Sequence, residues 1–247
     1  MSTQFAPASA SALQDAPAAR RVDLYAGIHK ALRRAMADTL VRLGQLDTAD
    51  AAEMQRTLGQ TEALLALMRS HLRHENDFIH TAIEARRAAG ARRTADDHLE
   101  HLGSIATLEA EVRTLAGAQP PMRPLLALRL YRHFALFVAE NLQHMHIEET
   151  ANNAALWSLY DDDELNALHD RLVASIPPAE MMEVLHWMGP ALAPHELAGL
   201  LGDMQRKAPP GAFQAVLDLL RPLIEPGRWV RLAAGLGLAG ARTRSAA

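Results

Sequence analysis

The chain has 247 residues, of which 49% are hydrophobic and 4% aromatic, with a formal net charge of −4 and no cysteine. The charge excludes the basic field of a typical nucleic-acid-binding protein, and the lack of cysteine excludes disulfides, thiolate metal sites and thiol catalysis. Ala and Leu dominate the composition, which favours helices over sheets. We therefore predict an all-α protein with one large domain or one and a half.

The segment 1–20 is rich in Ala, Ser and Pro and lacks the continuous apolar run of a signal peptide. We expect a disordered lead there. No stretch of the sequence approaches the roughly 18 uninterrupted apolar residues of a membrane span, so we expect a cytoplasmic protein without membrane contact.

Four long helical patterns follow, and Gly, Pro and acidic residues mark their ends. They cover residues 22–43, 48–89, 94–117 and 124–160. Gly44 is the expected C-cap of the first helix. We assign residues 21–160 to one helical domain.

A second region, 161–240, is predicted to be helical as well. The run Asp161–Asp163 is expected to cap a helix at 164–175. Further patterns cover 179–188, 194–207, 211–224 and 227–236, separated by Gly189–Pro190, Pro209–Pro210 and Pro226–Gly227. Their inward stripes carry no acids, so we expect an accessory region that packs against the first domain or another subunit.

Polar residues interrupt the inward face of two long helices. Residues three and four apart share a helix face, so each inward stripe can be followed along the sequence. In the second helix the stripe is Leu64, Met68, His71, Glu75, Phe78 and Ala82. In the fourth it is Phe134, Phe137, Asn141, His144, Glu148 and Ala151. Each helix therefore places a His-x-x-x-Glu pair where apolar residues belong.

The other two long helices each turn a histidine inward. His29 lies on the stripe of Tyr25 and Leu32, and His98 lies on the third helix with His101 close to the same face. A single inward histidine is more often a hydrogen-bonded core residue than a ligand. Two buried carboxylates and four buried imidazoles, with no Lys or Arg on the same stripes, need a cation to compensate them.

We therefore predict a metal site between the helices. Its expected ligands are His29, His71, Glu75, His98, His144 and Glu148. Imidazole and carboxylate without thiolate suit Fe, Mn or Zn. Two carboxylates able to bridge indicate two ions, and a redox role would indicate iron. The histidines off the stripes are expected to be exposed or to surround the ligands; these are His74, His80 and His146.

These motifs resemble those of the hemerythrin family, specifically its HHE cation-binding, hemerythrin-like branch. The resemblance covers about residues 22–160 and is carried by His29 in IHKALR, by HLRHENDF, by His98 in DDHLEHL and by HMHIEE. It implies an up-down-up-down four-helix bundle around a non-haem di-iron centre. It also implies bridging carboxylates and terminal histidines.

The sequence departs from the oxygen-carrying members at two positions. Those members have a His-x-x-x-His pair in the third helix, whereas Leu102 stands four residues after His98 here, with His101 as an alternative. They also place an Asp five residues after the last histidine, where this chain has Glu149; Glu148 continues the inward stripe better. The resemblance therefore implies a sensing or stress-response member rather than an oxygen carrier.

The leading functional prediction is a di-iron protein that binds or responds to O₂ or a related small oxidant. One alternative is an enzyme of the same fold that consumes peroxide or nitric oxide. Another is a sensor module whose C-terminal helices contact a protein partner or a second copy of the chain. No nucleic-acid partner is expected.

Overall fold

The structure, a computed structural model, describes residues 21–238. The disordered lead expected at 1–20 and the last two residues of the predicted region 161–240 lie outside the described residues. Within the described part of the chain, all regular elements are helices, which confirms the all-α class.

The long helical patterns of the first region appear as α1 Ala26–Gln45, α2 Ala51–His74, α3 Thr81–Arg86, α4 Arg92–Ala116, α5 Arg123–Ile147 and α6 Asn153–Leu159. Two π-helical segments, η2 Glu75–His80 and η4 Glu148–Asn152, join α2 to α3 and α5 to α6. A short 3-10 turn, η3 Pro120–Met122, precedes α5. The second and fourth predicted helices are thus continuous but change their winding part-way.

The first helix differs from its prediction at both ends. It begins at Ala26 rather than at residue 22, because the Asp23 side chain accepts hydrogen bonds from the backbone N–H groups of Tyr25 and Ala26 and turns the chain there. It also continues through Gly44 to Gln45. A Cβ atom at Gly44 would lie 3.1 Å from the Tyr131 ring, so this glycine permits close packing and does not end the helix.

The π-helical segment η2 moves the buried face of the second helix by one residue. The predicted stripe continued from Glu75 to Phe78 and Ala82, but both are only half-buried. Ile79 and Ile83 are buried in their place, at 2% and 0% exposure. A π-turn contains one residue more than an α-turn, so every later residue reaches the interior one position further along.

The same shift occurs in η4. Ala151, predicted to face inward, is exposed, whereas Asn152 is buried at 4% exposure. Up to Glu148 the prediction was correct, since Asn141, His144 and Glu148 are all buried. In both helices the inward stripe therefore fails just after the carboxylate.

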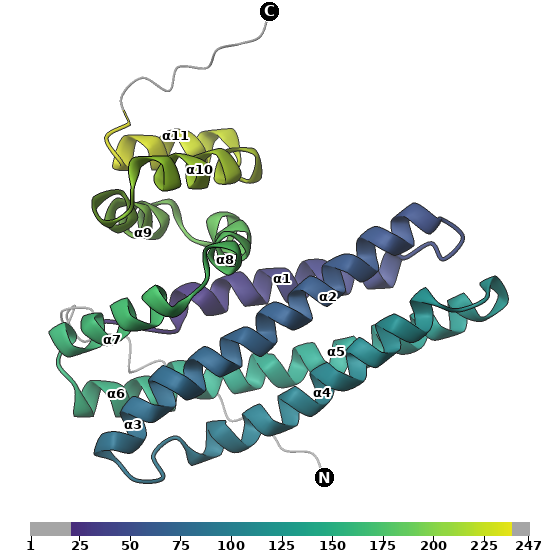
Figure 1. Cartoon of the computed structure of the whole chain (residues 1–247), viewed down its shortest axis with the longest axis horizontal. Coiled ribbons are helices and arrows are strands. Elements are labelled where there is room, and N and C mark those ends of the chain that lie inside the picture. Colours follow the sequence, from purple (N-terminus) through teal and green to yellow (C-terminus); the bar gives the residue numbers. More distant parts are fainter. Residues whose placement is uncertain (1–20, 239–247) are drawn as a thin grey trace, which may run out of the picture.

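The four long helices pack around a common interior. α1 contacts α2 and α5, and α4 contacts the same two helices (Figure 1). Leu32, Leu65, Ile105 and Phe134, one from each helix, are fully buried in one apolar cluster. A second apolar cluster, which includes Ile79 and Leu156, lies further along the helices. Each His-x-x-x-Glu pair contains the last residue that its helix gives to the first cluster, Leu72 or Met145, and is followed by the second cluster at Ile79 or Leu156.

The C-terminal helices are α7 Asp162–Ser175, α8 Pro178–Ala191, α9 Pro194–Lys207, α10 Pro210–Leu220 and α11 Pro226–Gly235, with a 3-10 turn η5 at Arg221–Leu223. As predicted, an aspartate caps the first of them: Asp161 accepts from Glu164 N, and the Glu164 side chain accepts from Asp161 N. Pro190 does not separate two helices as predicted but lies in the last turn of α8.

α8 joins the two regions. It packs against α1 and α2, while α10 packs on α8 and α11 packs on α9, so the last helices stack outward from the long ones (Figure 1). A Cβ atom at Gly189 would clash with Leu220 Cδ2, which shows how closely α8 and α10 approach. The predicted packing against the first region is therefore made within the chain. None of the helices in residues 21–238 is both long and apolar enough to span a membrane.

Candidate metal centre

The structure brings all six predicted ligands together. Their donor atoms form two groups: His29, His71, Glu75 and Glu148 make the first, and Glu75, His98, His144 and Glu148 make the second. Within each group the donor atoms lie within 4.8 Å of one another. None of the six residues is more than 8% exposed. Both carboxylates belong to both groups.

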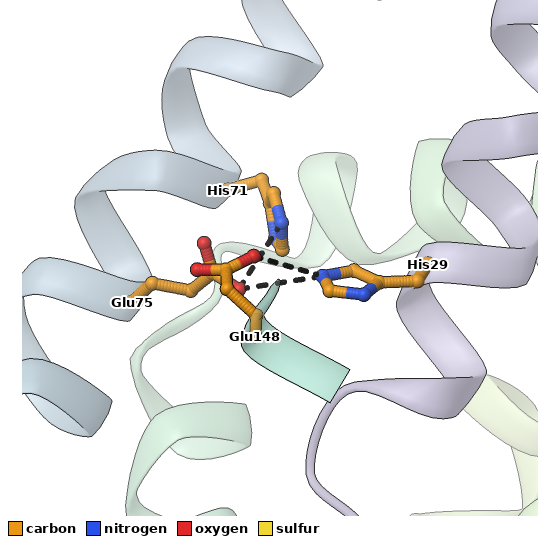
Figure 2. A group of neighbouring side chains, drawn as sticks. All are labelled: His29, His71, Glu75 and Glu148. Carbon is orange, nitrogen blue, oxygen red and sulfur yellow. Dashed lines mark ion pairs between the residues drawn. The ribbon is translucent and has the colours of Figure 1, made fainter. Parts of the chain in front are cut away.

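The first group is formed where α1 and α2 face the start of η4. Figure 2 shows the imidazoles of His29 and His71 directed at the carboxylates of Glu75 and Glu148. His29 Nε2 lies 3.5 Å from Glu75 Oε1 and 3.5 Å from Glu148 Oε2. His71 Nε2 lies 3.2 Å from the same Glu75 Oε1.

The second group uses the other oxygen of Glu75. His98 Nε2, from α4, lies 3.5 Å from Glu75 Oε2 and 3.4 Å from Glu148 Oε1. His144 Nε2, from α5, lies 3.3 Å from Glu148 Oε2. Glu75 thus turns one oxygen to each group, which is the arrangement of a bridging carboxylate.

These separations fit donors that surround common cations. Metal bonds to imidazole nitrogen and carboxylate oxygen are about 2.0–2.2 Å long, so neighbouring donors around one ion lie roughly 3.0–3.5 Å apart. The His98 and His144 Nε2 atoms are 3.0 Å apart, and the nitrogen–oxygen distances above range from 3.2 to 3.5 Å. The donor set therefore fits a dinuclear metal site.

The same atoms lack other partners. His29 Nε2 and both carboxylate oxygens of Glu75 and of Glu148 are buried without a hydrogen-bond partner among the described residues. A buried carboxylate without compensation is strongly unfavourable. A cation between these atoms removes that penalty.

The pKa shifts show what the metal-free site does with its charges. Burial raises the pKa of Glu75, and the negative charge of Glu148 raises it further. Burial also opposes ionisation of Glu148, but the imidazoles of His144 and His98 outweigh it and lower its pKa. Burial lowers the pKa of His29, yet Glu149 and Glu75 raise it to about 9. Without a metal, protons supply the positive charge.

Hydrogen bonds behind the imidazoles orient their Nε2 atoms toward the site. His29 Nδ1 lies 3.1 Å from Glu149 Oε1, and His98 Nδ1 donates to Asn76 Oδ1 at 2.8 Å. His144 Nδ1 lies 3.4 Å from Asp97 Oδ2. An acceptor on Nδ1 keeps the proton there and leaves the Nε2 lone pair for a metal.

The π-helical segments explain how two neighbouring residues reach one ring. In η2, Glu75 faces Nε2 of His98 while Asn76 holds its Nδ1. In η4, Glu148 faces Nε2 of His29 while Glu149 holds its Nδ1. The wider π-turn lets consecutive side chains face the interior, and π-turns frequently occur at functional sites. The spacing offers Glu149 only as an alternative ligand and does not predict a role for Asn76 or Asp97.

Two off-stripe histidines are also buried. His80 stacks on His98 with ring centroids 4.7 Å apart, and its Nε2 lies 3.1 Å from Thr94 Oγ1. His74 is 8% exposed and faces Glu180, with 3.6 Å between Nδ1 and Oε1. Both surround the ligands, whereas His146 is exposed. The π-turn accounts for the inward position of His80.

Of the two histidines of α4 that could face the site, His98 is the one whose ring nitrogen lies among the donor atoms. His101 belongs to neither donor group; its ring lies against that of His144, with centroids 4.7 Å apart. It is nevertheless buried, whereas Leu102, four residues after His98, is only half-buried. The buried face of α4 passes through Thr94, His98 and His101.

No protein-family model, curated protein or solved structure matches this chain. Any functional assignment therefore rests on the site itself.

Proposed function

We propose that this chain is a hemerythrin-like protein whose dinuclear metal centre, most simply di-iron, binds or responds to O₂ or a related small oxidant. The observation that carries the proposal is the sharing of Glu75 and Glu148 between two groups of histidines. Two buried carboxylates common to two imidazole pairs are what a two-ion centre requires, whereas a single ion would use one group.

The proposed bundle is α1, α2, α4 and α5 in up-down-up-down order. Two features support it: each helix packs against two of the other three, and the connections between consecutive long helices lie at alternating ends (Figure 1). Ligands on facing helices of such bundles project into one interior. The C-terminal helices α7–α11 then form an accessory region.

Two bound iron ions would supply electron transfer to a small oxidant. The chain would hold one ion with His29, His71 and the two glutamates, and the other with His98, His144 and the same glutamates. Glu149 fixes His29, and Arg33 in turn donates to both Glu149 oxygens at 2.5 and 2.9 Å. Iron, manganese and zinc all suit the donors.

Metal content per chain, measured after purification without chelator, tests the proposal. We expect close to two iron ions in the unaltered protein and at most one in Glu75→Gln or Glu148→Gln. Glu111→Gln is the matched control, because Glu111 is also a buried glutamate of the long helices but belongs to neither donor group. Unchanged occupancy in both ligand variants would refute the proposed centre.

A sensor with output through the C-terminal helices is the second candidate. The residues around His71 contact α8 directly: Ser70 donates to Glu180, and Arg73 lies 3.7 Å from the same carboxylate. A movement of the metal ligands would thus alter the contacts that hold α8. Metal- or oxidant-dependent binding of a partner supports this candidate. Turnover of peroxide or nitric oxide would support an enzyme instead.

A further inference from the structure

A cavity of about 830 Å³ lies between the long helices and the C-terminal region. One side of its wall comes from α1, α2 and η2, and the other from α7, α8 and α9. The ligands His71 and Glu75 form part of this wall. The cavity therefore reaches from the accessory helices to the candidate metal centre.

Most of the wall is apolar. Its side chains include Ile28, Leu172, Met181, Val184, Leu200 and Met204. Val184 is buried, and the other five are partly exposed although they lie between packed helices. Small-molecule sites commonly have volumes of about 300–1,000 Å³, mainly apolar walls and a few polar groups. A diatomic oxidant needs far less space, since a water molecule occupies about 30 Å³.

The charges of the wall indicate what kind of molecule it accepts. Its acidic side chains are Asp23, Glu75, Asp170, Glu180, Glu196 and Asp203. Lys207 is the one Lys or Arg of the wall within the described residues, and its ammonium lies 2.9 Å from Asp170 and 3.0 Å from Asp203. Glu196 is paired with Lys30 at 2.6 Å, and Glu180 accepts a hydrogen bond from Ser70. An anionic ligand would meet carboxylates without a free cation, and a cationic ligand would meet carboxylates that already have partners, so a neutral ligand is favoured.

The polar side chains of the wall include two groups: Asp170, Asp203 and Lys207 are paired with one another, and a second group lies beside the metal ligands. His74 and Glu180 belong to the wall beside His71, and Glu180 also accepts from Ser70. Away from these polar groups, α1 and α8 present apolar side chains to the cavity, such as Ile28 and Val184. We infer that the cavity binds a neutral, mainly hydrocarbon organic molecule whose polar end lies beside His71 and Glu75. The role of the polar end rests on the proposed function; the binding of the hydrocarbon body does not.

Fluorescence of the neutral apolar probe N-phenyl-1-naphthylamine tests the site in the full chain. We expect saturable binding of one probe per chain and displacement by primary alcohols. From hexanol upward, each added methylene should tighten competition roughly fourfold until the chain fills the cavity. Binding that does not saturate, or competition independent of chain length, would overturn the inference.

Substitutions that fill the cavity sharpen the test. Leu200→Trp and Met181→Trp should weaken probe binding at least tenfold, whereas Leu200→Ala should shift the best-fitting alcohol to a longer chain. Leu125→Trp is the control, because Leu125 is 63% exposed and outside the cavity wall. Helical circular dichroism identifies any variant that fails to fold. Equal probe affinity in all folded variants refutes the site. The site is also refuted if the unaltered chain binds no probe and is a dimer that Leu200→Trp converts to a monomer, because a second copy of the chain then covers the apolar wall.

Metal content measured on the same samples separates the two proposals. Saturable probe binding by a chain that holds no metal would refute the proposed function and leave the cavity site intact. A metal-loaded chain without saturable probe binding would refute the cavity site alone. With cobalt(II) as the bound metal, alcohol binding should change the visible absorption; an unchanged spectrum at saturation refutes the placement of the polar end.

Discussion

The two regions of this molecule bury different kinds of side chain. Every buried polar or charged residue of the described chain lies between His29 and Asn153. The buried side chains of α7–α11 are apolar, as in Leu185, Leu201 and Leu220. The first region thus encloses polar and charged groups within its apolar core, whereas the second encloses an ordinary apolar core.

The two regions therefore differ in what stabilises them. Apolar burial stabilises a helix pair by about 25 cal/mol per Å² without further requirements. Buried imidazoles and carboxylates stabilise the first region only when something compensates their charge. The first region should therefore depend on metal and pH, and the second should depend on packing alone.

Metal removal should produce the largest effect. A metal that binds only the folded chain stabilises it by about 4 kcal/mol when its free concentration is a thousand times Kd. For a chain of this length we expect chelation to lower Tm by roughly 10 °C. Calorimetry with and without chelator measures this shift. The double variant Glu75→Gln/Glu148→Gln should be insensitive to chelator; identical melting of the unaltered protein in both conditions would contradict the prediction.

Packing in the second region should have a smaller and separate effect. Leu220 is 0% exposed between α8 and α10, so Leu220→Ala should reduce the free energy of unfolding by about 3 kcal/mol. Metal content should not change. Val230→Ala, at a side chain that is 66% exposed, should change stability by no more than about 0.5 kcal/mol. Loss of metal in Leu220→Ala would show that the two regions are not separable in this way.

The sequence was sufficient to predict the helices and the six side chains that converge between them. The predicted helix ends lie close to the observed ones where a capping residue marks them, as at Asp161 and at Gly117, the C-cap of α4. The six convergent side chains were predicted correctly because strict three-and-four spacing holds up to each glutamate. Nothing in the local sequence marks a π-turn, so the positions after Glu75 and Glu148 were predicted one residue out of phase.

The outer layer of the site depends on tertiary contacts that spacing does not encode. Asn76 reaches His98 across 22 positions of sequence, and Glu149 reaches His29 across 120. On an ideal α-helix, a neighbour of an inward residue points about 100° away. Only the π-turn and the packing of α1 and α4 turn these neighbours inward. The cavity could not be predicted from the sequence either, because it lies between two regions whose relative placement the sequence does not specify.

The stability of the metal-free chain should depend on pH through the first region. The pKa of His29 is raised from 6.5 to about 9, so its stabilising contribution is fully present below pH 6.5 and is lost as the pH rises through 9. The loss is at most about 3 kcal/mol. Bound metal keeps His29 unprotonated at every pH in this range and should abolish the loss.

Denaturant unfolding between pH 6.5 and 9, with and without metal, measures this effect. His29→Gln is the control variant and should be flat over that range. A metal-free protein as stable at pH 9 as at pH 6.5 would contradict the assignment of the charge to His29.

The smallest effect should come from Asn76, which holds His98 from behind. Asn76→Ala removes the acceptor of the His98 Nδ1 proton, and loss of such a partner typically lowers metal affinity 10- to 100-fold, or about 1.4–2.7 kcal/mol. Two ions should still bind at saturating metal, because no donor atom is lost. Asn76→Asp retains an acceptor and should restore most of the affinity.

Asp77→Ala is the matched control, since Asp77 is the exposed neighbour in η2. Competition with a chelator of known affinity measures the change. Equal affinities in Asn76→Ala and Asp77→Ala would mean that the ring of His98 is held by its packing against His80 and not by this hydrogen bond.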